Sequence, residues 1–481
     1  MVVKHHPPPH VAQKYRIPKI WKGDLESDIG KSILNCDDDG PTVMMIVNMT
    51  IDPAAGPVAI GRLFSGKIKD GQTINIIDTK REGRVQSVNF FMSNVREQVG
   101  ELSAGNIPAL LGLTEARAGQ TLSTIKDTPV FEASKYVSEP VVQMAIEPKH
   151  PKDLPKLVDT LRKLTIEDPN LVIKIDEESG ETIMAGMGVL HLDVAVNLIK
   201  DAKVDIITSE PLINYRETIA GGCDPIMAKS PNRHNKLFMK VEPLEPELAE
   251  MCRNGTLSEM KDKKEMATIL REHGWDTDTS KKVMRFDSRG NVMINGTKGV
   301  QFIDESSDSI LSGFDEVMRE GGLTKEQVRN CKFTFTHFVP HEDTAHRGLS
   351  QLGPASRRAC LGAFLSAEPM LLEPMLAIEV RVPTDLIGDV ASVLQAKRGK
   401  VIDMQQKGAT SIVIGEVPAS ETFDLSEKMR GQTAGKAMWN SHFKEWTPIP
   451  KSIGATLLQE IRKRKGLSPD PPQATEFIDK E

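Results

Sequence analysis

Residues 337–358 read HFVPHEDTAHRGLSQLGPASRR, and the rest of the chain is organised around this stretch. A β-rich run, residues 331–338, ends here in a polar turn that contains His341, His346 and Arg347. A helix is predicted to begin near Pro354, because proline suits the first turn of a helix. Strand, tight polar loop and helix together predict a loop at the end of a domain.

Three kinds of site fit this loop. His341 and His346 could bind a metal, although their i, i+5 spacing suits no single helical face and no cysteine pair lies nearby. A catalytic histidine needs an orienting third group, whose position the sequence does not fix. An exposed tip that offers an imidazole and Arg347 to an anionic partner fits the residues best. An ordinary polar hairpin loop is the plain alternative.

Composition indicates a soluble globular protein of several domains. The chain has 481 residues, of which 39% are hydrophobic and 27% charged. No apolar run approaches the length of a membrane span, and the first residues lack the pattern of a signal peptide, so we expect a cytoplasmic protein without membrane contact. The five cysteines never form a CxxC pair, which argues against a disulfide framework and a zinc ribbon.

The charge pattern allows only local contact with nucleic acid. A net charge of -6 is not the basic field of a protein that coats phosphates. Three short basic runs remain as candidate RNA contacts, each with a solvated surface as its plain alternative. They are 357–358, 397–400 and 462–465.

Hydrophobic patterns divide the first half of the chain into three segments. Residues 1–39 have no regular period and are predicted to be a linker. Residues 40–125 contain short β-branched runs separated by Gly or Pro turns, which predict a closed or nearly closed β-barrel. Residues 139–210 read as βαββαβ, the order of a ferredoxin-like sandwich, here called the first sandwich. Its second helix is expected to pack through Leu190, Val194 and Leu198, with His191 against the sheet.

The second half contains three more segments. Residues 211–374, the tip domain, include the stretch 337–358 and a helix with Ile310, Phe314 and Val317 on one face, ended by Gly321-Gly322. Residues 375–450 repeat the ferredoxin-like order and form the second sandwich. Residues 451–481 contain an amphipathic helix that ends in a basic run.

No nucleotide site is visible in the sequence. A phosphate loop needs GxxxxGK[ST], in which glycines allow backbone N–H groups to approach the phosphates. The run 56–61 is followed by Arg62-Leu63, and 431–436 is one residue too short. No NKxD tetrapeptide occurs either. We therefore expect no GTP binding or hydrolysis, and no other enzyme activity, by these residues.

Several runs resemble one family in the same order. Residues 341–348 with Gln351 resemble the domain IV tip of the archaeal and eukaryotic elongation factor 2 family of translational GTPases. Further resemblances lie at 1–21 (the connector that follows the GTPase domain), 61–71, 186–193, 210–219, 230–236 and 443–446. Ala345 and Leu349-Ser350 depart from the residues usual at the tip.

The resemblance implies a multidomain α+β architecture. The barrel would be domain II, the sandwiches domains III and V, and the tip domain an S5-like domain IV on which the C-terminal helix packs. His346 would be modified to diphthamide. The residues implied to contact RNA at the tip are His341, Asp343, Arg347, Gly348, Gln351 and Arg357.

The implied function is GTP-dependent translocation of tRNA and mRNA on the ribosome. The implied partners are both ribosomal subunits with their rRNA, tRNA and mRNA at the decoding centre. GTP and magnesium would be held by a GTPase domain absent from this sequence, on the same or on a separate chain; no cofactor or metal is expected here. A ribosome-binding paralogue without a GTPase and an RNA-binding scaffold outside translation remain alternatives.

Overall fold

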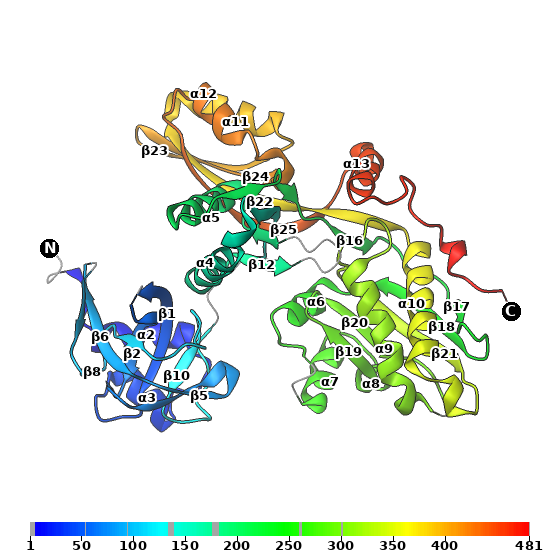
Figure 1. Ribbon diagram of the computed structural model, residues 1–481, viewed down its shortest axis with the longest axis horizontal. Helices are drawn as coiled ribbons and strands as arrows, with labels where there is room; N and C mark the ends of the chain where they lie inside the picture. Colours follow the sequence, from blue (N-terminus) through cyan, green and yellow to red (C-terminus); the bar gives the residue numbers. More distant parts are fainter. Residues whose placement is uncertain are drawn as a thin grey trace. The chain divides into compact units, whose positions relative to one another are not determined.

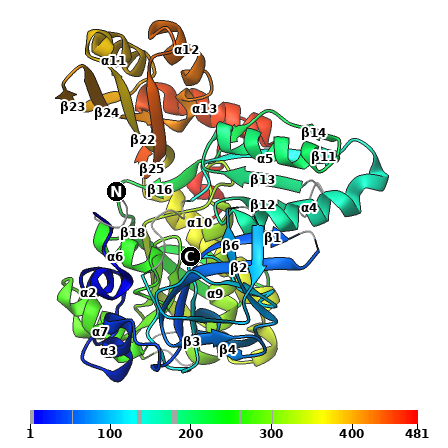
Figure 2. The same ribbon diagram turned by 90° about the vertical axis from the view of Figure 1, so that its left-hand side faces the viewer.

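The computed structural model describes residues 5–52, 54–93, 95–132, 139–175, 182–258, 262–299 and 302–480. It divides into two compact units, Met1–Leu212 and Ile213–Glu481, drawn in Figures 1 and 2. Parts of the segments 1–39, 40–125, 139–210, 211–374 and 451–481, and the start of the connector run 1–21, lie outside the described residues.

Two helices precede the first strand. α2 (Pro9–Ile20) begins at a proline, and α3 (Asp28–Asn35) is capped by the Ser27 hydroxyl, which accepts a hydrogen bond from an N–H of its first turn. Ile17, Trp21 and Ile33 are buried in one cluster with residues of the barrel. Residues 1–39, expected to be a linker, therefore contain two packed helices in their described part. α2, which contains Pro18, has little apolar pattern, whereas α3 is amphipathic but only 8 residues long.

The barrel segment forms an eight-stranded sheet around one apolar core. Its order is β5-β4-β10-β1-β2-β9-β6-β7, each pair antiparallel, with a short β3–β8 pair beside it. Met44, Leu63 and Leu110 are among the buried residues of the core. The elements are β1 (Val43–Asp52), β2 (Gly56–Ser65), β3 (Lys67–Lys69), β4 (Thr73–Ile76), η1 (Ile77–Thr79), β5 (Arg81–Arg84), β6 (Ser87–Met92), β7 (Val95–Gln98), β8 (Glu101–Ser103), β9 (Ala109–Leu111) and β10 (Thr121–Ser123).

The first sandwich has the predicted ferredoxin-like order. Its sheet runs β12-β13-β11-β14 with antiparallel pairs, so the first and third strands lie in the middle. Figure 2 shows the strands with α4 and α5 beside them. The elements are β11 (Val142–Pro148), η2 (Pro151–Asp153), α4 (Leu154–Glu167), β12 (Val172–Ile175), β13 (Thr182–Gly186), α5 (Val189–Asp201) and β14 (Ile206–Thr208).

Helix α5 packs through a different face from the one expected. Leu192, Ala195 and Ile199 are buried, whereas the predicted residues Leu190, Val194 and Leu198 are 75%, 49% and 46% exposed. Both sets have helical spacing, so periodicity alone could not choose between them.

His191 lies in a structural contact, as expected. Its Nδ1 accepts a hydrogen bond from the Met187 N–H at 3.1 Å, and its Nε2 lies 2.6 Å from a carboxylate oxygen of Asp168. Because Nδ1 is an acceptor, Nε2 carries the proton and donates to Asp168. The side chain thus ties the start of α5 to the end of α4.

The tip domain is a five-stranded sheet in the order β17-β18-β21-β20-β19, with β20 and β21 parallel. Figure 1 shows α9 and α10 lying over its strands. The two helices can approach closely because Gly313 has no side chain: a Cβ at this position would lie 2.4 Å from the Gly353 carbonyl oxygen. The elements are β17 (Ile226–Lys229), β18 (Lys236–Pro243), β19 (Val283–Asp287), β20 (Asn291–Asn295), α9 (Ile303–Glu320), β21 (Cys331–Val339), η3 (Thr344–His346) and α10 (Leu349–Ser366).

The predicted helix face and stop of α9 are confirmed. Ile310, Phe314 and Val317 are at most 1% exposed, and Gly321 follows the last helical residue at a φ of 60°. The fully buried carboxylate of Glu217, on β16 (Arg216–Ile219), accepts N–H bonds from residues 322, 323, 324 and 326. Burial raises the pKa of this carboxyl, and the backbone donors oppose the rise.

A polar insertion between β18 and β19 has its own core. Leu248, Leu270 and Trp275 are buried there against Val292 and Ile294 of β20. Its described helices are α6 (Pro246–Arg253), α7 (Lys263–Glu272) and α8 (Thr277–Lys281).

The second sandwich repeats the ferredoxin-like order around one long strand. β22 pairs with β16 near its start and then lies between β24 and β25, and β23 pairs with β24. Val390, Val393 and Leu394 form the buried face of α11. The elements are β22 (Pro369–Pro383), η4 (Thr384–Leu386), α11 (Ile387–Ala396), β23 (Lys400–Lys407), β24 (Thr410–Pro418), η5 (Ala419–Glu421), α12 (Leu425–Gln432) and β25 (Met438–Pro448).

The C-terminal segment returns to the tip domain. On α13 (Lys451–Arg464), Arg462 is 6% exposed and donates to the carbonyl oxygens of Leu323 and Ser468. After η6 (Ala474–Glu476), the Asp479 N–H donates to the Met227 carbonyl on β17 at 3.0 Å. Within the described ranges, no helix is long and apolar enough to cross a membrane.

Candidate functional site

The stretch 337–358 comprises the end of β21, the loop 340–348 and the first half of α10, and it forms the end of the tip domain. The helix begins at Leu349, with Gly348 in extended conformation before it, so the prediction of a start near Pro354 is wrong by about one and a half turns. Pro354 lies inside α10, where it removes one backbone donor to the Ser350 carbonyl. The residues between the two elements fold into a compact loop with the short helix η3 at its centre.

A second loop, residues 230–235 between β17 and β18, holds this loop in place. The side chain of Asn235 is fully buried; its Nδ2 donates to the His346 carbonyl at 2.7 Å. Its Oδ1 accepts from the His341 N–H at 2.9 Å. The Asn232 N–H donates to the Gln351 side chain at 3.0 Å. The family resemblance singled out the run 230–236, but its residues were not predicted as site residues.

Three imidazoles gather where the two loops meet. The ring centroids of His341 and His346 lie 4.7 Å apart, and that of His234 lies 5.0 and 5.1 Å from them. His346 is half-buried rather than enclosed in a core. Asn232 Nδ2 lies 3.5 Å from its Nδ1, at the limit of a hydrogen bond. The loops therefore fix the backbone of His346 and leave part of its ring accessible.

The other predicted tip residues have mainly structural contacts. Asp343 caps η3 by accepting the Ala345 N–H at 2.9 Å, and its own N–H donates to His341 Nδ1 at 3.1 Å. Gly348 is exposed at the start of α10. Arg357 forms an ion pair with Glu316 at 2.7 Å, each about two fifths exposed. RNA contact by these residues stays a prediction.

Arg347 is not exposed, which corrects the expectation from the sequence. Its side chain is 4% exposed, and its guanidinium carbon lies 3.9 Å from the ring centroid of Phe302. One nitrogen reaches Glu305 at 3.5 Å, while Nε and Nη1 are buried without a partner. The guanidinium belongs to the packing between the loop and α9, so it is not offered at the surface in this conformation.

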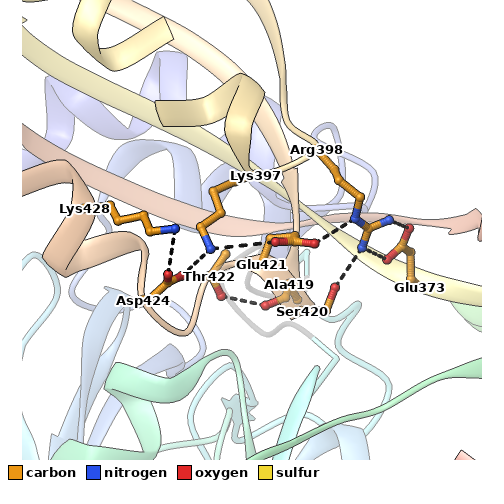
Figure 3. A network of polar contacts seen from close by, with 9 residues as sticks. All are labelled: Glu373, Lys397, Arg398, Ala419, Ser420, Glu421, Thr422, Asp424 and Lys428. Carbon is orange, nitrogen blue, oxygen red and sulfur yellow. Dashed lines mark hydrogen bonds and ion pairs between the residues drawn. The ribbon is translucent and has the colours of Figure 1, made fainter. Parts of the chain in front are cut away.

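The basic turn 397–400 is also used within the fold (Figure 3). Arg398 makes two parallel bonds to Glu373, at 2.9 and 2.8 Å, and one to Glu421 at 2.8 Å. Lys397 pairs with Asp424 at 2.5 Å, and Lys428 reaches the same carboxylate at 3.1 Å. These two lysines hold the pKa of Asp424 down at about 2. Of this run, Lys400 is exposed.

The other two basic runs are partly used as well. Arg462 is buried on α13, and Lys465 pairs with Glu326 at 2.6 Å. Arg358 pairs with Asp479 at 3.1 Å. Lys463 and Arg464 are exposed, so part of the run 462–465 remains available for an anionic partner.

The cysteines do not form a reactive site. All five are free, and Cys252, Cys331 and Cys360 are buried. Burial raises the pKa of the Cys252 and Cys360 thiols to about 12 and also raises that of Cys331. These three groups remain protonated near neutral pH and are poor nucleophiles.

The structure offers no fit for GTP in the two glycine runs. Residues 56–61 lie within β2, and 431–436 span the end of α12 and the turn after it, so neither forms the strand–loop–helix of a phosphate loop. In the part of the chain that the structure describes, no group of three or more His, Cys, Asp or Glu side chains could hold a metal ion.

Four family models match successive parts of the chain. Residues 56–123 match elongation factor Tu domain 2, and 137–210 match domain III of elongation factor G. Residues 256–368 match domain IV of elongation factor G, and 370–457 match its C-terminus. The loop that carries His346 thus lies within the match to domain IV.

Whole-chain relatives agree. Elongation factor 2 of Cenarchaeum symbiosum (strain A) is 74% identical over 481 residues, which cover 100% of this chain and 66% of that protein. Elongation factor 2 of Sulfurisphaera tokodaii is 47% identical, and that of Metallosphaera sedula 46%, each over 99% of this chain and 66% of the relative. The chain therefore spans just under two thirds of the length of these relatives. With its domains matched in order and this identity along its whole length, the chain belongs to the elongation factor G and elongation factor 2 family of translational GTPases.

Proposed function

We propose that this chain is the ribosome-contacting part of a translation elongation factor that promotes translocation of tRNA and mRNA. The observation that carries the proposal is the two-loop tip. Backbone contacts fix His346 in the loop at the end of the tip domain, within the match to domain IV, and its half-buried ring stays partly accessible. A fixed imidazole at the end of a domain suits recognition of folded RNA by shape and phosphate contact.

The chain's residues supply binding and positioning, and no step of nucleotide chemistry is assigned to them. The two glycine runs do not form a phosphate loop. As part of the same proposal, GTP and magnesium are held by the GTPase domain of the family and not by the residues of this chain. Because its proposed site of action is the ribosome, the same proposal includes a cytoplasmic location.

Modification of His346 to diphthamide is the second half of the proposal. Leu349, one of the departures from the family tip, is 61% exposed at the first position of α10, so it does not displace the histidine. The tryptic peptide 333–347 from the native host should carry the mass of diphthamide on His346. An unmodified mass would remove this half of the proposal only.

Ribosome binding provides the main test. The chain should sediment with archaeal ribosomes at low salt and dissociate between about 50 and 200 mM salt, because phosphate contacts release counterions. It should also compete with intact elongation factor 2. His346→Ala should weaken competition while stability changes by less than about 0.5 kcal/mol, since the ring is not in a core. If the chain stays in the supernatant at low salt, a ribosomal role is excluded.

A further inference from the structure

We propose that Asn235 is the positioning residue for His346: one buried amide ties both ends of the tip loop and sets how His346 is presented. The proposal rests on the proposed function, because it names the group that prepares that site. It concerns a residue that contacts the histidine's backbone and not the RNA.

The position of Asn235 explains why a side chain does this task. The paired residues of β18 and β21 end at Lys236 and Val339. Asn235 lies one residue outside this ladder, where the next backbone pair would be expected. Its side chain supplies the missing bonds: it accepts from the His341 N–H at 2.9 Å and donates to the His346 carbonyl at 2.7 Å.

The amide itself is held firmly. Its backbone N–H and its Nδ2 both donate to the Ser230 hydroxyl oxygen, at 3.0 and 3.1 Å. Asn235 is 0% exposed and Ser230 is 2% exposed. Water therefore does not compete for these bonds, and a buried donor or acceptor left without a hydrogen bond would destabilise the fold.

Few residues could replace Asn235. The task needs one donor and one acceptor on a short side chain; aspartate has no donor when ionised, and alanine has neither group. Because the bonds join residues 341 and 346, they also set the spacing of the two rings that lie 4.7 Å apart. A loop ordered in advance binds without paying that ordering cost on the ribosome.

The test compares Asn235→Ala with a matched control, Asn89→Ala. Asn89 is also buried, at 3% exposed, and its amide donates to the Ala109 carbonyl in the barrel. The readouts, on the 481-residue chain, are amide hydrogen exchange of residues 341–347 and the histidine Cε1–Hε1 NMR signals. Asn235→Ala removes the hydrogen bonds to the His341 N–H and the His346 carbonyl. It should therefore speed that exchange about tenfold and shift the His341 and His346 signals. Asn89→Ala should change neither.

Two further variants keep the test decisive. Asn235→Asp retains the acceptor for the His341 N–H but loses the donor, so His346 should loosen more than His341. Ser230→Ala removes the hydroxyl that accepts from the backbone N–H and the Nδ2 of Asn235 but leaves the bonds of Asn235 to His341 and His346, so it should give a smaller increase in exchange. The proposal is overturned if Asn235→Ala and Ser230→Ala leave exchange at 341–347 unchanged, or if Asn89→Ala speeds it equally.

The outcome separates this proposal from the proposed function. If exchange rises in Asn235→Ala but the parent chain does not bind ribosomes, the positioning role stands and the ribosomal role fails. If the parent chain binds ribosomes and exchange does not rise, the reverse holds.

Discussion

Arg347 at the tip was expected to face an anionic partner, and Arg398 in the second sandwich lies in a basic run that was a candidate for such a contact; both turn inward. Arg398 meets Glu373, Glu421 and Ser420, and the Glu373 side chain is itself 4% exposed. Arg347 has one long contact to Glu305 and two buried nitrogens without a partner. The contacts of Arg398 therefore stabilise the turn 397–400, whereas the unpaired buried nitrogens of Arg347 locally destabilise the tip. Binding regions often draw on the less stable parts of a fold.

The largest expected effect is that of Arg398→Met. The substitution would leave the Glu373 carboxylate buried without its partner, which costs about 3–5 kcal/mol. Urea unfolding monitored by hydrogen exchange in residues 370–448 would measure it. Arg381→Met is the control, since the Arg381 side chain is 68% exposed and its pair with Glu379 contributes at most about 1 kcal/mol. Equal losses for the two variants would contradict the contrast.

Arg347→Met is expected to change stability by no more than about 1 kcal/mol. It loses an ion pair with a largely exposed glutamate, but it also removes two unpaired buried donors and keeps an apolar stem on Phe302. The same urea unfolding, followed in residues 302–347, measures the change. A loss above about 3 kcal/mol would show that the guanidinium has partners in solution that make it as stabilising as Arg398.

The turn 397–400 should also respond to acid. The pKa of Asp424 is lowered to about 2, chiefly by Lys397 and Lys428, from about 3.9 in the unfolded chain. Its contribution is present above about pH 4 and is lost as the pH falls toward 2. Asp424→Asn should lower stability at pH 7, and the difference from the parent chain should disappear near pH 2. A pH-independent difference would rule out the ion pairs as its cause.

The smallest effect is expected for Arg357→Ala. Its pair with Glu316 is short, but both side chains are more than one third exposed, so the loss should be about 0–1 kcal/mol. If ribosome competition weakens in this variant while its melting temperature is unchanged, Arg357 acts at the surface as the resemblance implies. Unchanged competition would restrict it to the fold.

The sequence predicted the helices and strands better than it predicted which of their faces are buried and what their side chains contact. The βαββαβ order of residues 139–210 and its repeat in 375–450 were enough to derive the two sandwiches, because the periodicities of strands and helices are local patterns. The exposed face of α5 was misassigned because two helical faces carry leucine and valine. The start of α10 was placed late because Pro354 is tolerated inside the helix. The inward turn of Arg347 depends on Phe302, a residue with no sequence signal for that contact.

Long-range contacts account for what was missed at the site. Asn235 meets His341 and His346 across more than one hundred residues, and a single sequence does not show such pairs. The signal that existed was the run 230–236, a turn rich in asparagine before a strand. This run predicts a loop at its own position, but it does not show that the loop contacts the one that carries His341 and His346.

The contact of the C-terminal tail with β17 has a mechanical consequence. The second sandwich leaves the tip domain through β22, and the tail returns to it at Asp479, whose carboxylate also accepts the Lys229 N–H at 2.7 Å. A force applied to the last residues is therefore resisted first by these hydrogen bonds and by the ion pair between Arg358 and Asp479. The second sandwich is shielded from that load until the tail peels away, so tension at this end should open the sheet edge of the tip domain before it strains β22–β25.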